Sequence, residues 1–151
     1  MDPTEAPGHL ARRFQQIAVA VFHAEVGAAG CDLTPVQFAA LTKIAAEPGL
    51  DQATLAGLIA YDRTTIGGVV DRLVEKGFVA REISAKDRRA RELRITKAGR
   101  DMLKRIAPAV EETQRILLSG LSEKEAAQFM KLLNKAIAAL NDLSRAPLRA
   151  A

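Results

Sequence analysis

The fold is decided by residues 51–97, which read DQATLAGLIAYDRTTIGGVVDRLVEKGFVAREISAKDRRARELRITK. Two short stretches with helical spacing of apolar residues lie on either side of a tight turn that begins at Tyr61. Asp51 and Asp62 stand where the two helices need N-terminal caps, and Gly77 ends the second helix. Two short helices joined by a tight turn form a helix-turn-helix.

After the second helix the pattern changes from helical to extended. Apolar and polar residues alternate over residues 79–83 and again over 93–95, which predicts two strands. Between them, residues 84–90 form the polar tip SAKDRRA. Thr96 then caps a long helix that is expected to bend near Pro108 and to end at about residue 118. The sequence therefore predicts a winged helix, with the basic hairpin as the wing.

The flanking segments are predicted to be helical. A disordered arm of about eight residues is expected first, followed by a helix over 10–29. Capping boxes at Thr34 and Ser122 open a second helix and a last helix. Hydrophobic residues make up 48% of the 151-residue chain and aromatic residues only 4%, which favours helices over an aromatic-rich β-sandwich. The expected fold class is mainly α, in a single compact unit with a small β-hairpin.

Positive charge is concentrated in one part of the chain. Residues 63–105 hold 13 Lys and Arg against 6 Asp and Glu, whereas the remainder carries a net charge of −3. Each cation placed near a phosphate releases a condensed counterion, so this segment suits binding to a nucleic acid. A solvated surface of mixed charge is the alternative.

The second helix of the helix-turn-helix is expected to enter the major groove of DNA with its N-terminal residues at base edges. Arg63 can bind guanine through two hydrogen bonds, and a threonine offers a hydroxyl and a methyl group. The residues predicted to contact DNA from the two helices are Gln52, Arg63, Thr64, Thr65 and Arg72.

The hairpin tip is expected to reach the adjacent minor groove, where a narrow width attracts arginine. The predicted contacts of the tip are Lys86, Arg88, Arg89 and Arg91. Asp87 is expected to pair with one of these guanidinium groups and to hold the tip in shape. The alternative for the tip is a solvated charged loop.

Three stretches resemble the MarR family of bacterial regulators: residues 33–38 (LTPVQF), residues 55–77, and DRR at 87–89 leading to LRITKAG at 93–99. The resemblance covers residues 10–143, and the wing motif is its most specific part. It implies a DNA-binding transcriptional regulator, most often a repressor.

The resemblance also implies a homodimer in which the first and last helices of two subunits interlock. Residues 1–33 and 105–151 would then form the dimerisation region, and 34–104 the winged helix-turn-helix lobe. Two such lobes would bind successive major grooves of a pseudo-palindromic operator in double-stranded DNA. The wide apolar face of the last helix independently favours a partner subunit, because a monomer would leave part of that face wet.

Members of the family commonly respond to small aromatic acids, and this chain resembles the branch that senses hydroxylated benzoates or nicotinates. A basic side chain over an apolar cleft suits an aromatic carboxylate. The residues predicted to bind such an effector are His9, Arg13, His23 and Tyr61. A contact across the dimer interface is the alternative for Arg13 and His23.

Two other functions stay open at this point. Cys31, the one cysteine, would allow a redox-sensing repressor, although it lies in an inter-helix loop. A winged-helix module for protein interaction is the second, but it does not explain the arginine-rich tip. Two histidines without ligand spacing and no phosphate-binding glycine loop argue against an enzyme, a metal or another cofactor. We expect a cytoplasmic protein, because no signal peptide or membrane-length apolar run is present.

Overall fold

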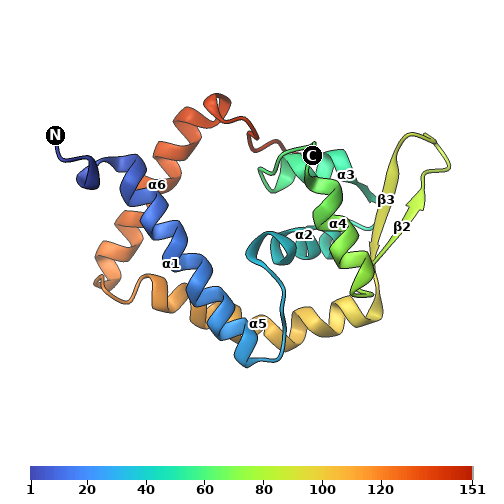
Figure 1. The fold of residues 1–151 in the computed structure, drawn as a ribbon, viewed down its shortest axis with the longest axis horizontal. Helices are drawn as coiled ribbons and strands as arrows, with labels where there is room; N and C mark the ends of the chain where they lie inside the picture. The colour runs from blue at the N-terminus through green and yellow to red at the C-terminus, as the bar shows by residue number, and fades with distance from the viewer. Residues whose placement is uncertain (151) are drawn as a thin grey trace.

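A computed structural model describes residues 1–150 of the chain. The fold is mainly α with a small antiparallel sheet, as the sequence predicts (Figure 1). Its helices are α1 (Pro7–Ala28), α2 (Pro35–Ala46), α3 (Gln52–Leu58), α4 (Ile66–Glu75), α5 (Lys97–Leu117) and α6 (Glu123–Leu140). Its strands are β1 (Leu50–Asp51), β2 (Val79–Ile83) and β3 (Arg91–Ile95), and short 3-10 helices lie at Pro3–Glu5 (η1) and Asn141–Leu143 (η2). Within residues 1–150, no helix combines the length and the apolar character that a membrane crossing requires.

The predicted capping boxes at Thr34 and Ser122 are confirmed. At the start of α2, the Thr34 hydroxyl accepts a hydrogen bond from the Gln37 amide and the Gln37 side chain accepts one from the Thr34 amide, each at 3.2 Å. Ser122 and Glu125 form the same reciprocal box before α6. These bonds satisfy amide groups that a helix cannot satisfy by itself, so they fix where the helix begins.

The N-terminal arm differs from the prediction. Residues 3–5 form a 3-10 helix, capped by the Asp2 carboxylate, which accepts a hydrogen bond from the Thr4 amide at 2.9 Å. Helix α1 begins at Pro7 rather than at residue 10. Proline at the first helical position is favourable, because its missing N–H has no partner there and its φ angle is already helical.

The sheet joins the wing to the start of α3. Strand β3 lies between β1 and β2, with Leu93 opposite Leu50 and Ile95 opposite Val79. The two-residue strand β1 was not predicted, because it is too short to show alternation. One buried apolar cluster fills the lobe beneath the sheet; its fully buried members include Leu33, Leu41, Ile44, Leu55, Val70, Leu73 and Leu93.

The outer helices leave a large apolar surface uncovered. Helix α1 packs along α5, whereas α6 meets α1 through the rings of Phe14 and Phe129, whose centroids are 5.6 Å apart (Figure 1). None of the described residues of α6 is buried, and 58% of Ile137 is exposed. An apolar helix face of this kind requires another surface to cover it.

Candidate DNA-binding surface

A turn stabilised by Asp62 precedes helix α4. The Asp62 carboxylate accepts hydrogen bonds from the amide and the hydroxyl of Thr64, both at 2.8 Å, and these bonds lower the pKa of Asp62. Helix α4 begins only at Ile66, so the prediction that Arg63, Thr64 and Thr65 form its first turn is wrong. The reason is that Asp62 closes a tighter turn over residues 63–65, which leaves all three side chains exposed ahead of the helix.

Arg81, which the sequence analysis did not single out, connects the wing to both helices of the helix-turn-helix. Its guanidinium donates to Asp71 of α4 at 2.6 Å and to the Gln52 side chain of α3 at 3.2 Å. The alternation of strand β2 puts Arg81 on the same face as the buried Val79, but no sequence pattern indicates its partners. The Gln52 oxygen is therefore engaged within the protein, and its NH₂ group is available to donate to another contact.

The wing tip is shaped by hydrogen bonds to its backbone. The Ser84 hydroxyl accepts hydrogen bonds from the amides of Lys86 and Asp87 at 3.2 and 3.3 Å. Asp87 in turn accepts from the Arg89 amide at 3.0 Å. Asp87 thus holds the tip as expected, but through a backbone amide; within residues 1–150 it forms no ion pair with a guanidinium group.

The structure brings the helix-turn-helix and the wing together around one groove of about 420 Å³, which we call the wing groove. Five of the predicted site residues line it: Gln52, Arg63, Asp87, Arg89 and Arg91. The other predicted cations and threonines are exposed on the same elements outside the groove: Thr64, Thr65, Arg72, Lys86 and Arg88.

The positive charge at this surface is largely uncompensated. Within residues 1–150, the side chains of Arg63, Lys86, Arg88 and Arg89 form no ion pair. Arg72 pairs with Glu75 at 3.3 Å, but both side chains are about two-thirds exposed. Free cations of this kind around a groove suit a polyanion, because no internal ion pair has to be broken when they bind.

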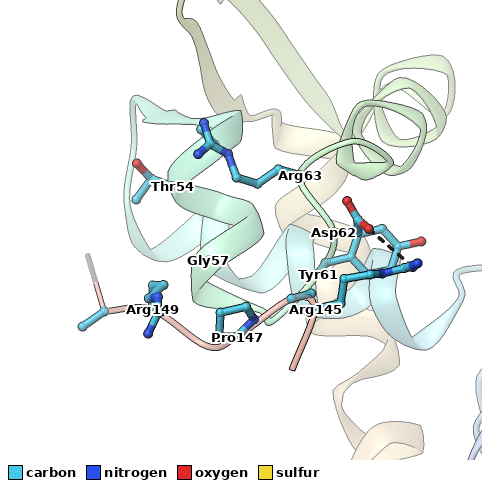
Figure 2. Close-up of a pocket in the computed structure, with 11 residues that line it drawn as sticks. Thr54, Gly57, Tyr61, Asp62, Arg63, Arg145, Pro147 and Arg149 are labelled. Atoms are coloured by element: carbon cyan, nitrogen blue, oxygen red, sulfur yellow. Dashed lines mark ion pairs between the residues drawn. The ribbon is translucent and has the colours of Figure 1, made fainter. Parts of the chain in front are cut away.

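Two of the four residues predicted to bind an effector, Arg13 and Tyr61, line different pockets. Arg13 lines an apolar cleft between α1 and α6, of about 610 Å³, together with Phe14 and Phe129. The His9 Nδ1 atom lies 3.3 Å from a guanidinium nitrogen of Arg12. The His23 ring packs edge-on against the Phe22 ring. Tyr61 lines a different pocket, beside Arg63 and the C-terminal residues (Figure 2).

Cys31 is buried, with 8% of its surface exposed, in the apolar cluster of the lobe. Redox-sensing thiols are usually accessible and lie in electropositive surroundings. The position of Cys31 therefore gives no support to a redox role.

Fold and surface together define a winged helix-turn-helix protein of the DNA-binding class. The sequence profile of the MarR family matches residues 33–90. The chain is 30% identical over 138 residues to the HTH-type transcriptional repressor NicR of Pseudomonas putida, covering 90% of this chain and 85% of that protein. The chain belongs to the MarR family, whose members are DNA-binding transcriptional regulators and not enzymes.

Solved structures agree with this assignment. The PcaV transcriptional regulator of Streptomyces coelicolor, in complex with its natural ligand, matches with a TM-score of 0.83 and 33% identity, over 92% of this chain and 96% of that chain. BpsR of Bordetella bronchiseptica, whose DNA binding is regulated by 6-hydroxynicotinic acid, matches with a TM-score of 0.82 and 27% identity, over 90% of this chain and 96% of that chain.

Proposed function

We propose that this protein is a repressor that binds a pseudo-palindromic operator as a homodimer and releases it when a small aromatic carboxylate binds. The observation that carries the DNA-binding part is the wing groove. Arg63, from the turn at residues 63–65 that we call the recognition turn, lines this groove together with Arg89 of the wing tip. In this proposal residues 63–65 read base edges in the major groove, and the wing tip lies against the minor groove.

The dimer is supported by the uncovered helix α6. Its apolar stripe includes Met130 and Ile137, which are 43% and 58% exposed, and the cleft beside it is lined mainly by apolar side chains. A second copy of the same surface would bury this stripe and place two lobes on one face of the duplex. We assign residues 1–33 and 105–151 to the dimerisation region and 34–104 to the DNA-binding lobe, although residues 145–150 also lie against α3 in this chain.

The effector class is supported by the relatives and by Arg13. BpsR responds to 6-hydroxynicotinic acid, an aromatic acid. In this chain, the exposed Arg13 guanidinium borders an apolar cleft that contains two phenylalanine rings. We propose that the carboxylate of the effector binds this guanidinium group and that its aromatic ring packs against the apolar wall of the cleft. His9, His23 and Tyr61 could join such a site only through the partner subunit or a rearrangement of the chain.

A two-stage experiment tests this proposal. Duplexes selected from a random pool by the wild-type protein give a binding sequence, and hydroxybenzoates and nicotinates are then screened by thermal shift. Compounds that raise the melting temperature should also release the selected duplex in fluorescence anisotropy, with a coupling of about 1–3 kcal/mol. Failure to select any duplex would contradict the DNA-binding assignment, and binding of the duplex without release by any aromatic acid would contradict only the effector class.

The variant Arg13→Ala tests the ligand arrangement. It should reduce duplex release by a hit compound at least tenfold while leaving duplex affinity and dimer mass unchanged. Lys131→Ala, which removes an exposed cation from α6, is the matched control and should respond as the wild type does. Loss of the dimer in Arg13→Ala would show that Arg13 serves the interface instead.

A further inference from the structure

The last residues of the chain form a closed loop, residues 141–150, which we call the C-terminal hook. The Asn141 side chain donates to the Leu148 carbonyl at 3.0 Å and accepts from the Leu148 amide at 2.9 Å. Asp142 and Arg149 form an ion pair at 2.9 Å across the same loop. These contacts hold the hook in one conformation, whereas the sequence analysis placed these residues without distinction in the dimerisation region.

The hook lies directly on helix α3. The Arg149 amide donates to the Gly57 carbonyl at 2.8 Å, and a methyl group at Gly57 would lie 3.0 Å from the Arg149 Cβ atom. A larger residue at position 57 would therefore force the Arg149 side chain to shift slightly away from α3. In Figure 2 the hook passes beneath α3 and leads from Arg145 through Pro147 to Arg149.

Arg145 lies beside the recognition turn. Its guanidinium is 3.5 Å from the Asp62 carboxylate, one residue before Arg63, and 91% of the Arg145 side chain is exposed (Figure 2). A carboxylate at this position would repel a nucleic acid backbone, and the Arg145 charge offsets it. Arg145 and Arg63 line the same pocket.

The pocket under the hook continues into the wing groove. It has a volume of about 420 Å³ and is lined by three arginines, Arg63, Arg145 and Arg149. Ala53 and Arg63 line both this pocket and the wing groove. The basic surface therefore runs from the wing tip, past the recognition turn, to the hook.

We propose that the C-terminal hook is part of the DNA-binding surface and that Arg145 and Arg149 bind backbone phosphates beside the recognition turn. The inference rests on the proposed DNA-binding function and extends it to residues outside the winged helix. The side chains of Arg145 and Arg149 are 91% and 60% exposed, so both guanidinium groups can exchange a carboxylate for a phosphate at little cost. Phosphate contacts add affinity without adding sequence preference.

The salt dependence of duplex binding tests this inference, because each lost phosphate contact lowers the slope of log K against log salt by about 0.9. The variant Arg145→Ala/Arg149→Ala is titrated by anisotropy with a random-sequence duplex of roughly 30 base pairs, which spans three turns of DNA. Because the proposed homodimer loses four arginines, its slope should be smaller than that of the wild type by about 3.6. Lys104→Ala/Lys124→Ala, which removes two exposed cations outside both pockets, lowers the net charge equally and should keep the wild-type slope.

Two further measurements separate a phosphate contact from a structural clamp. Arg145→Lys/Arg149→Lys keeps both charges and should keep the wild-type slope. A double alanine variant with weaker binding but an unchanged slope would overturn the inference, since the hook would then only brace α3. The inference would also be overturned if Lys104→Ala/Lys124→Ala lost as much slope as Arg145→Ala/Arg149→Ala. If the wild-type protein shows no salt-dependent duplex binding, the proposed function fails together with the inference. If the wild type shows salt-dependent binding and Arg145→Ala/Arg149→Ala has the same slope, the inference alone is refuted.

Discussion

Arg63, in the turn before α4, and Arg89, at the wing tip, line the same groove. Neither side chain forms an ion pair within residues 1–150. The helix-turn-helix and the wing therefore present their free charges to one ligand, and a DNA duplex with adjacent major and minor grooves has the matching shape.

The first prediction concerns the wing. Arg89→Ala should weaken duplex binding and reduce the salt slope by about 1.8, because each proposed homodimer loses two contacts. Dimer mass by light scattering should not change, because the wing lies away from α6. Lys104→Ala is the control of equal charge. An Arg89→Ala protein that binds with wild-type affinity would remove the wing from the DNA-binding surface.

The second prediction concerns the uncovered face of α6. Ile137→Glu places a charge on a side chain that is 58% exposed in the single chain and that a partner subunit is expected to bury. The variant should run as a monomer in size-exclusion chromatography with light scattering, and its duplex affinity should fall at least tenfold. Gln128→Glu, on an exposed polar position of the same helix, should stay dimeric. A dimeric Ile137→Glu protein would place the interface elsewhere.

The third prediction concerns Gly99 at the start of α5. A methyl group there would overlap the Phe78 carbonyl and the Ile95 side chain, so Gly99→Ala should destabilise the fold by about 1–3 kcal/mol. Gly27→Ala, where nothing lies within 4 Å of the added methyl, should be neutral or stabilise α1 by up to about 1 kcal/mol. Urea unfolding of both variants measures the difference, and equal stabilities would contradict the close packing of Gly99.

The fourth prediction concerns the pH dependence of the α3 cap. Burial raises the pKa of the Asp51 carboxyl, but hydrogen bonds from the Thr54 amide and hydroxyl outweigh it, so the pKa lies below its ordinary value near 4. The stabilisation is thus complete above pH 4 and is lost as the pH falls through the lowered pKa. Asp51→Ala should cost about 1 kcal/mol at neutral pH.

The free energy of unfolding of Asp51→Ala should approach that of the wild type in acid, because protonation of Asp51 weakens the cap in the wild type alone. Asp51→Asn is the control, since its side-chain oxygen can still accept from the Thr54 amide without titrating. A gap between wild type and Asp51→Ala that is as large in acid as at neutral pH would contradict the role of the charged cap.

The sequence predicts those elements whose signals are local. Thr34, Thr96 and Ser122 mark helix starts through side-chain caps, and each cap is present. The start of α4 was misplaced because Asp62 can cap either a helix or a tighter turn, and only the packing of Ile66 decides between them. The C-terminal hook was missed because its contact with Gly57 joins residues far apart in the chain, for which no periodicity exists.

The Asp71–Arg81–Gln52 contacts have a consequence for regulation. One guanidinium contacts α4, α3 and the wing, so it ties these three elements to one another. Under the proposed function, we therefore expect an effector bound near α1 to leave the arrangement of these three elements within each subunit unchanged. We expect it instead to change the distance between the α4 helices of the two subunits, so that the spacing of the half-sites decides whether the operator stays bound.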